Sequence, residues 1–353
     1  MGNDMLIFAS ALALAIGVTP LVRSMALRAG IVDRPAARKV HLTPKPLLGG
    51  VAMYLAFVVA LLVFSDRFNL PQLFGVLVGA TLVALSGYWD DWRGLRPLFK
   101  LVVQVSAALI LYLSGVQVLL FRAEPVNLFL TLVWVVGITN SFNLLDNMDG
   151  LSGGVAAVAA AFFLLLAAMN KQILVASLSA AVLGACLGFL RYNFNPFSPA
   201  SVFMGDVGAQ FLGFVLAALG IKLRFFGNTN MVTWMIPVVM LGLPVFDTSL
   251  VVVSRLRRGL NPLTTPGKDH LSHRLVAMGM TQREAVLVLY LVSGALGMVA
   301  VYLTQASLLE AYLLGVVLLL VYVVALARLV MLDRKLGITT PREVAGEPTA
   351  KGG

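Results

Sequence analysis

The sequence predicts an all-α integral membrane protein, built as a polytopic bundle of about ten or eleven transmembrane helices. Of the 353 residues, 59% are hydrophobic and only 12% are charged, and the mean hydropathy is +0.93. Soluble globular proteins have a far more even balance of apolar and charged residues. The basic residues also gather in alternate connections, which is the pattern that orients membrane proteins.

Long apolar stretches recur along the chain. A transmembrane helix needs about 20 mostly apolar residues, and stretches of this kind lie at 5–22, 48–64, 71–88, 98–115, 125–140, 150–169, 172–190, 207–222, 231–254, 286–304 and 308–328. The first stretch lacks the flanks of a cleaved signal peptide, so we expect it to be retained. We therefore expect a single transmembrane domain over residues 1–332 and a polar, disordered cytoplasmic tail over residues 333–353.

The distribution of basic residues predicts the orientation of the chain. Most of the 26 lysines and arginines lie in the odd-numbered connections, counted from the first stretch, or in the C-terminal tail. The positive-inside rule then places the N-terminus outside and the C-terminus in the cytoplasm, in a protein that crosses the inner (plasma) membrane many times. Topology and contact with anionic membrane lipids explain the net charge of +10, so nucleic acid is not expected as a partner.

Four polar clusters fall in the odd-numbered connections and so on the predicted cytoplasmic face. They contain Asp90 and Asp91; Asn140, Asn143, Asp146 and Asp149; Asp206; and Asp269, His270 and His273. Converging carboxylates repel one another unless a divalent cation neutralises them, and oxygen ligands beside phosphate favour Mg²⁺, with Mn²⁺ as an alternative. We therefore expect a metal-dependent site for phosphoryl transfer at the cytoplasmic surface.

Each cluster also has a simpler interpretation. Asp90 and Asp91 could cap a helix, and His270 and His273 could pack against lipid head groups. Asp247, which lies close to two prolines, could serve only to stabilise a break in its helix. Since all of these explanations would have to coincide on one face of the membrane, the catalytic interpretation is preferred.

Five motifs in a fixed order carry a resemblance to a known family. They are RKVHLTPKPLLGG at 38–50, DDWRGLRPLFK at 90–100, NSFNLLDNMDGLSGG at 140–154, FMGDVGAQFLGF at 203–214 and DHLSHRL at 269–275. The chain resembles the polyprenyl-phosphate N-acetylhexosamine-1-phosphate transferases, the membrane family of MraY and WecA/TagO type. The resemblance implies dependence on Mg²⁺, a cytoplasmic site for a UDP-sugar, a polyprenyl phosphate acceptor and a homodimer.

Within that family, the form N-x-F-N-L-x-D is similar to the branch that uses UDP-N-acetylglucosamine. The implied reaction transfers N-acetylglucosamine-1-phosphate, or a close N-acetylhexosamine-1-phosphate, to undecaprenyl phosphate and releases UMP. This would be the first membrane step of a cell-envelope glycan pathway, such as lipopolysaccharide or teichoic acid synthesis. Two positions depart from the family pattern, because Asn147 stands where glycine is common and Ser272 where a run of histidines has its middle member.

The resemblance also implies roles for individual residues. Asp206 is expected to bind Mg²⁺, with Asp91 as a second ligand, and Asp90 to contact and deprotonate the lipid phosphate. Lys100, which would steady a phosphate, and Asp149 complete the expected catalytic set. The expected substrate-binding residues are Lys45, Asn140, Asn143, Asp146, His270, His273 and Arg274. A single transfer step and a route through a covalent aspartyl intermediate both agree with this set.

Two other functions would use similar residues. The branch that acts on UDP-N-acetylmuramoyl-pentapeptide usually lacks the phenylalanine that this chain has at position 142. We therefore expect that the pentapeptide donor is not a substrate. A secondary transporter would place its ionisable groups near the middle of the bilayer, between repeated halves. Here the groups gather at one surface and the sequence has no internal repeat, which favours an enzyme.

Overall fold

The protein folds almost entirely into helices. The structure is a computed structural model that describes residues 2–33, 44–64, 70–195, 198–225, 227–262, 265 and 267–333. Its helices are α1 (Gly2–Ala29), α2 (Gly49–Phe64), α3 (Leu70–Arg93), α4 (Pro97–Leu113), α5 (Glu124–Leu145), α6 (Leu151–Met169), α7 (Ile173–Asn193), α8 (Gly205–Lys222), α9 (Asn230–Met240), α10 (Gly242–Arg257), α11 (Leu271–Ala277), α12 (Gln282–Leu303) and α13 (Leu308–Met331). Two short strands, β1 (Val32–Asp33) and β2 (Lys45–Pro46), pair antiparallel.

Eight of the described helices are long and apolar enough to cross a membrane, and the bent pair α9 and α10 could form a ninth span. Helices α2 and α4 are shorter and also apolar. Every predicted apolar stretch thus coincides with a helix or, for 231–254, with a pair of helices. The predicted class, an all-α polytopic membrane protein, is confirmed. The number of helices that cross the bilayer and the sides of the two termini stay predictions, and the tail from residue 334 onward lies outside the described residues.

Several helices begin at signals that the sequence contains. Prolines stand in the first turns of α4 and α5, where a missing N–H group costs no hydrogen bond. Thr281 and Ser307 precede α12 and α13, and each forms a capping box with a glutamate three residues further on. Local sequence therefore sets where these helices begin.

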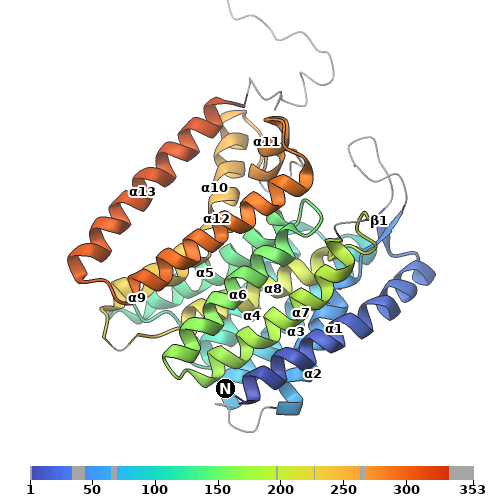
Figure 1. Ribbon diagram of the computed structural model, residues 1–353, viewed down its shortest axis with the longest axis horizontal. Coiled ribbons are helices and arrows are strands. Elements are labelled where there is room, and N and C mark those ends of the chain that lie inside the picture. Colours follow the sequence, from blue (N-terminus) through green and yellow to red (C-terminus); the bar gives the residue numbers. More distant parts are fainter. Residues whose placement is uncertain are drawn as a thin grey trace, which may run out of the picture.

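Helix α8 lies at the centre of the bundle (Figure 1) and packs against α2, α3, α5 and α6. Of its membrane-length segment 83% is buried, compared with 6% for α13, which stands at one edge of the molecule. Because Asp206 lies in the first turn of α8, the best-packed helix of the bundle carries the predicted metal ligand.

The predicted stretch 231–254 is broken, and its two helices α9 and α10 meet at an angle of 71°. The break lies between Pro237 and Pro244, as the sequence suggested. A proline lacks the N–H group that would continue the helical ladder, and its ring crowds the preceding turn. As a result, α10 packs against α5, α12 and α13, and its Asp247 lies beside His270.

The strand pair, which was not predicted, supports the segment that leads into α8. Figure 1 shows β1 at the end of the bundle opposite the N-terminus. The N–H group of Phe203 donates to the carbonyl of Pro46 at 2.8 Å, and that of Gly49 donates to the carbonyl of Phe203 at 3.0 Å. Arg23 of α1 donates to the carbonyl of Ser201 at 3.0 Å. These bonds fix the start of α8.

Candidate active site

The candidate site is built around the first turn of α8, which carries Asp206. Asp91, near the end of α3, accepts hydrogen bonds from the backbone N–H groups of Asp206 at 3.0 Å and Val207 at 3.4 Å. The first amides of a helix have no partner within it, and a carboxylate there also interacts favourably with the helix dipole. Asp91 therefore holds the backbone that presents Asp206.

Two glycines allow α3 and α8 to come this close. Gly205 has a φ of +69°, and a Cβ atom there would collide with the carboxylate of Asp91 and lie 2.9 Å from the carbonyl oxygen of Leu47. At Gly87 on α3, a Cβ atom would lie only 2.5 Å from the backbone nitrogen of Val207. The glycine before Asp206 in the motif MGDVG thus has a steric and conformational explanation.

Replacing Gly205 by alanine is therefore expected to disturb this turn. Alanine in a left-handed conformation costs about 1–2 kcal/mol, and its methyl group would displace Asp91. We expect a loss of at least about tenfold in kcat/KM together with a lower melting temperature. Gly137→Ala is the control, because nothing lies within 4 Å of a Cβ atom at that helical position. Wild-type rates and stability in the Gly205 variant would contradict this explanation.

Lys100 joins acids from two other helices. Its Nζ atom forms ion pairs with Oδ2 of Asp90 on α3 and Oδ2 of Asp206 on α8. The other oxygen of Asp90 accepts a hydrogen bond from the N–H group of Leu95 at 2.5 Å. The structure therefore brings together four residues predicted to be catalytic or metal-binding, Asp90, Asp91, Lys100 and Asp206.

A network of buried amides lies one helical turn beyond Lys100. Asn140 of α5 donates to Oε1 of Gln104 on α4 at 2.6 Å, and Gln104 donates to Oε1 of Gln210 on α8 at 3.3 Å. Asn140 also donates to the carbonyl of Val136 at 2.8 Å. Buried polar groups need such partners. Asn140, predicted to bind substrate, is thus engaged in joining α5 to its neighbours.

The turn after α5 adds further acids. Asp146 follows the last residue of α5, and Oδ2 of Asp149 accepts from the N–H group of Ala200 at 3.4 Å. Burial, followed by the negative charges of Asp206 and Asp149, raises the pKa of Asp146 to about 8. Oδ1 of Asn143 is buried and has no hydrogen-bond partner within the described residues. The turn after α5 therefore adds carboxyl groups close to Asp206, one of which holds its proton near neutral pH, and a buried oxygen that has no partner within the described residues.

The charge and ligand types of this group of acids fit Mg²⁺. Asp206 interacts electrostatically with Asp90, Asp91 and Asp146, and Lys100 supplies one positive charge to this group. Carboxylate and amide oxygens are the ligands that Mg²⁺ prefers. Within the described residues, no three His, Cys, Asp or Glu side chains already stand together as a metal site, and Lys100 lies between two of the acids.

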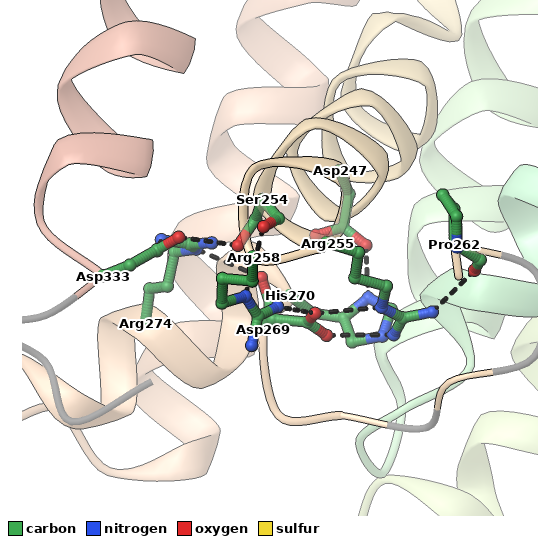
Figure 2. A network of polar contacts seen from close by, with 9 residues as sticks. All are labelled: Asp247, Ser254, Arg255, Arg258, Pro262, Asp269, His270, Arg274 and Asp333. Atoms are coloured by element: carbon green, nitrogen blue, oxygen red, sulfur yellow. Dashed lines mark hydrogen bonds and ion pairs between the residues drawn. The ribbon is translucent and has the colours of Figure 1, made fainter. Parts of the chain in front are cut away.

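The two histidines lie on a segment that follows α10 and contacts the turn after α5. Nδ1 of His270 lies 2.8 Å from Oδ2 of Asp247 (Figure 2). The N–H group of Leu271 donates to Oδ1 of the same carboxylate at 2.6 Å. Asp247 is therefore engaged in orienting His270, which goes beyond the helix-break role considered from the sequence. The bond at Nδ1 leaves Nε2 as the ring nitrogen that can contact a substrate.

His273 is a neutral side chain at physiological pH. Burial and the nearby charges of His270 and Lys268 lower its pKa to about 4, although Asp247 and Asp269 act in the opposite direction. Its Nδ1 atom is buried and has no hydrogen-bond partner among the described residues. A neutral imidazole can donate from one nitrogen and accept at the other, so His273 is equipped to contact a ligand.

Paired charges hold the histidine segment in place (Figure 2). Arg255 donates two hydrogen bonds of 2.9 Å to the carboxylate of Asp269, and Arg258 donates a third of 2.5 Å. Burial raises the pKa of Asp269, but the hydrogen bonds and charge of Arg255 outweigh it, so that the pKa lies below its usual value. Asp269 is therefore ionised and anchors the segment to the end of α10.

Two residues predicted to bind substrate are engaged by the protein itself. Arg274 is fully buried, donates to the carbonyls of Asp269 at 3.1 Å and Leu329 at 2.8 Å, and pairs with Asp333 at the end of α13. Nζ of Lys45 donates to the carbonyl of Ala200 at 2.7 Å. Lys45 thus supports the segment before α8, and Arg274 ties the histidine segment to α13, although its Nη2 atom has no partner within the described residues.

Comparison with known proteins places the chain in a family. The family described as "Glycosyl transferase family 4" matches residues 73–224. A probable undecaprenyl-phosphate N-acetylglucosaminyl 1-phosphate transferase of Bacillus subtilis is 32% identical over 318 residues, which cover 87% of this chain and 87% of the relative. The chain belongs to this family of polyprenyl-phosphate N-acetylglucosamine-1-phosphate transferases.

Other members of the family are similar over most of their length. Decaprenyl-phosphate N-acetylglucosaminephosphotransferase of Mycolicibacterium smegmatis is 35% identical, over 77% of this chain and 75% of the relative. Undecaprenyl-phosphate alpha-N-acetylglucosaminyl 1-phosphate transferase of Escherichia coli is 25% identical, over 85% and 84%. The family match at 73–224 includes all five acids of the candidate site, Asp90, Asp91, Asp146, Asp149 and Asp206, and ends before the histidine segment.

Sequence reasoning missed several residues that build the site. Asn193 accepts from the N–H group of Gly150 at 2.7 Å and donates to the carbonyl of Val202 at 2.9 Å, so it joins the turn after α5 to the segment before α8. Gln104 was missed in the same way. Gln104 is an amide in an apolar stretch, and the cost of burying it is the signal that could have revealed it. Asn193 lies past the predicted stretch 172–190 among other polar residues, where no such signal stands out.

Proposed function

We propose that the protein is an enzyme that transfers N-acetylglucosamine-1-phosphate from UDP-N-acetylglucosamine to undecaprenyl phosphate and releases UMP. The observation that carries the proposal is the ion-paired group of Lys100 with Asp90 and Asp206, which gathers three helices around a surplus of carboxylates. The names of the relatives support both the transferred sugar phosphate and the polyprenyl acceptor.

In the proposed reaction, an oxygen of the lipid phosphate attacks the phosphorus that bears the sugar. A new phosphorus–oxygen bond joins the two phosphates, and the bond from that phosphorus to the bridging oxygen breaks, so that UMP leaves with this oxygen. A phosphate monoester has a second pKa of about 6 and is mostly dianionic at neutral pH. The acceptor therefore needs no strong base, which agrees with the engagement of Asp90 by Lys100 and Leu95.

Different residues of the site would bind the phosphates and the donor. Lys100 would give up part of its ion pairing with the acids and bind a phosphate of a substrate instead. An ammonium group neutralises phosphate as a point charge. His270, oriented by Asp247, and the neutral His273 would donate hydrogen bonds to the donor. Catalysis would then rest on placing the two phosphates in line.

We further propose that Mg²⁺ binds at Asp206 and Asp146, with the unsatisfied Oδ1 of Asn143 as a neutral oxygen donor. When bound, this ion would neutralise the charge of the pyrophosphate and polarise it. Asp91 as a second ligand stays a prediction, because both of its oxygens accept from amides of α8.

The site is proposed to face the cytoplasm across the plasma membrane, with the N-terminus outside and the C-terminus inside. This orientation rests on the basic connections, which include the one after α10 that carries Arg258 and Lys268. If α2 and α4 also cross the bilayer, the protein has ten or eleven spans. The homodimer implied by the resemblance stays a prediction.

Labelling of introduced cysteines tests this orientation. Cysteines at Arg93, Asn195 and Gly267 are expected to be shielded from a membrane-impermeant thiol reagent in intact cells, whereas a cysteine at Gly227 should react. The native Cys186 is buried and should give little background. Permeabilised cells provide the control for reactivity at each position. The reverse pattern would place the candidate site outside the cell and overturn the proposal.

Turnover with defined substrates tests the function itself. The purified protein is given undecaprenyl phosphate, Mg²⁺ and either sugar-labelled UDP-N-acetylglucosamine or UDP-N-acetylmuramoyl-pentapeptide. We expect lipid-linked label with the first donor and none with the second. Efficient use of the pentapeptide donor would reject the assignment to the N-acetylglucosamine branch, and failure to form lipid-linked product from either donor would reject the transferase.

A further inference from the structure

One hydrogen bond joins the two segments that surround the candidate donor site. Oγ of Ser272 donates to Oδ1 of Asn147 at 2.6 Å, although 125 positions separate the two residues in the chain. Ser272 is buried, with 1% of its surface exposed. Asn147 lies next to Asp146, in the turn after α5, and Ser272 lies next to His273. The bond therefore ties the acidic turn to the histidine segment.

The side chain of Asn147 is oriented for this bond. Its Nδ2 atom donates to the carbonyl of Leu144 at 2.9 Å, and its backbone N–H group donates to the carbonyl of Leu145 at 2.8 Å. A carbonyl oxygen can only accept, so the nitrogen of the amide must face Leu144 and the oxygen is left for Ser272. The end of α5 thus fixes an acceptor at the place where the hydroxyl arrives.

Each of the two joined segments also presents a buried polar atom that has no partner in the described residues. These atoms are Oδ1 of Asn143 and Nδ1 of His273. Asn143 lies four residues before Asn147, and His273 is the residue after Ser272. An unsatisfied buried atom is costly in an empty protein and is explained when a ligand supplies its partner. A ligand that binds along both segments would supply these partners, and the relative position of the segments would then matter for binding.

The two residues also stand at the two positions where, by the resemblance described above, the sequence departs from the common family motifs. A glycine at 147 would have no side chain to accept a hydrogen bond. A histidine at 272 would need space for an imidazole in a buried position that lies 2.6 Å from the Asn147 oxygen. The departures therefore meet in the structure and are complementary, because the smaller serine fits beside the larger asparagine.

We propose that Asn147 and Ser272 act as a matched pair of positioning residues, which holds the His270–His273 segment against the Asp146 turn and so shapes the site for the nucleotide-sugar donor. This inference rests on the proposed function and deepens it, since it assigns donor binding to a contact between two segments. The pair touches no reacting atom, and its effect passes through the neighbours of both residues.

A double-mutant cycle tests the pairing. Asn147→Ala, Ser272→Ala and the double variant are compared with wild type for kcat, for the KM of each substrate and for the dissociation constant of UDP-N-acetylglucosamine. We expect each single change to raise the KM and dissociation constant of the donor by about tenfold, with kcat and the KM of the acceptor within about twofold. The double variant should be no worse than either single variant, because the same bond is lost. Ser179→Ala, which removes a buried hydroxyl bonded to the carbonyl of Val175 far from the site, is the control.

Exchange for the family residues is a second and independent test. Ser272→His alone should weaken donor binding by more than about tenfold, because the imidazole overlaps Asn147. Adding Asn147→Gly should restore most of the loss. Additive losses in the first cycle, or no recovery in the exchange, would overturn the pairing even if wild type forms lipid-linked product. If wild type binds the donor but forms no product, the proposed function fails, and the pairing is still decided by the dissociation constants.

Discussion

Replacing Asp206 by asparagine is expected to lower kcat/KM by at least about a hundredfold. The change removes a charged ligand from the proposed Mg²⁺ site and one of the two acids that hold Lys100. The backbone N–H group of residue 206 still has its bond to Asp91, so the start of α8 should survive. The measurement is the initial rate of the purified variant over a range of Mg²⁺ concentrations, where added Mg²⁺ should recover part of the activity.

The control for Asp206→Asn is Asp4→Asn. Asp4 lies in the first turn of α1 and accepts from Ser177 near the start of α7, at the opposite end of the bundle from Asp206. This variant loses the same charge and should keep wild-type rates. If Asp206→Asn showed an unchanged dependence on Mg²⁺, Asp206 would not be a metal ligand.

Replacing Lys100 by glutamine is expected to have an effect of similar size, at least about a hundredfold in kcat/KM. The change removes the cation that pairs with Asp90 and Asp206 and leaves their carboxylates to repel each other. It also removes the ammonium group proposed to receive a phosphate. The rate and the melting temperature are measured together, and both should fall.

A second substitution separates the two roles of Lys100. In Lys100→Gln/Asp90→Asn one of the repelling charges is gone, so the melting temperature should recover part of its loss. Activity should stay low, because no cation is available for phosphate. Recovery of both the melting temperature and the activity would show that Lys100 serves only to neutralise the acids. It would contradict the proposal that Lys100 binds a phosphate of the substrate.

The fold was largely predictable from the sequence because most of the apolar stretches have the length of a membrane helix. The bend between α9 and α10 was foreseeable from Pro237 and Pro244, but its angle of 71° depends on packing that no local signal encodes. The strand pair was missed because strands of two residues carry no periodicity. Where a helix begins is therefore a local property, whereas its direction is set by its neighbours.

The site was predictable in its residue types and less so in the direction of its side chains. Asp90, Lys100 and Asp206 meet as expected, since their motifs lie at one end of adjacent helices. Arg274 and Lys45 carry charge suited to phosphate, yet both bind carbonyl groups of the protein. A motif gives the identity of a residue, and only the packing around it decides whether a cation faces substrate or a loop.

The destination of the donor's second phosphate tests the central claim most directly. UDP-N-acetylglucosamine labelled at the phosphorus that bears the sugar is incubated with the purified protein, undecaprenyl phosphate and Mg²⁺, and the lipid and nucleotide products are separated. Transfer of the sugar-1-phosphate predicts that the label enters the lipid product and that unlabelled UMP is released in equal amount. Label retained in UDP, with the sugar alone on the lipid, would contradict the account.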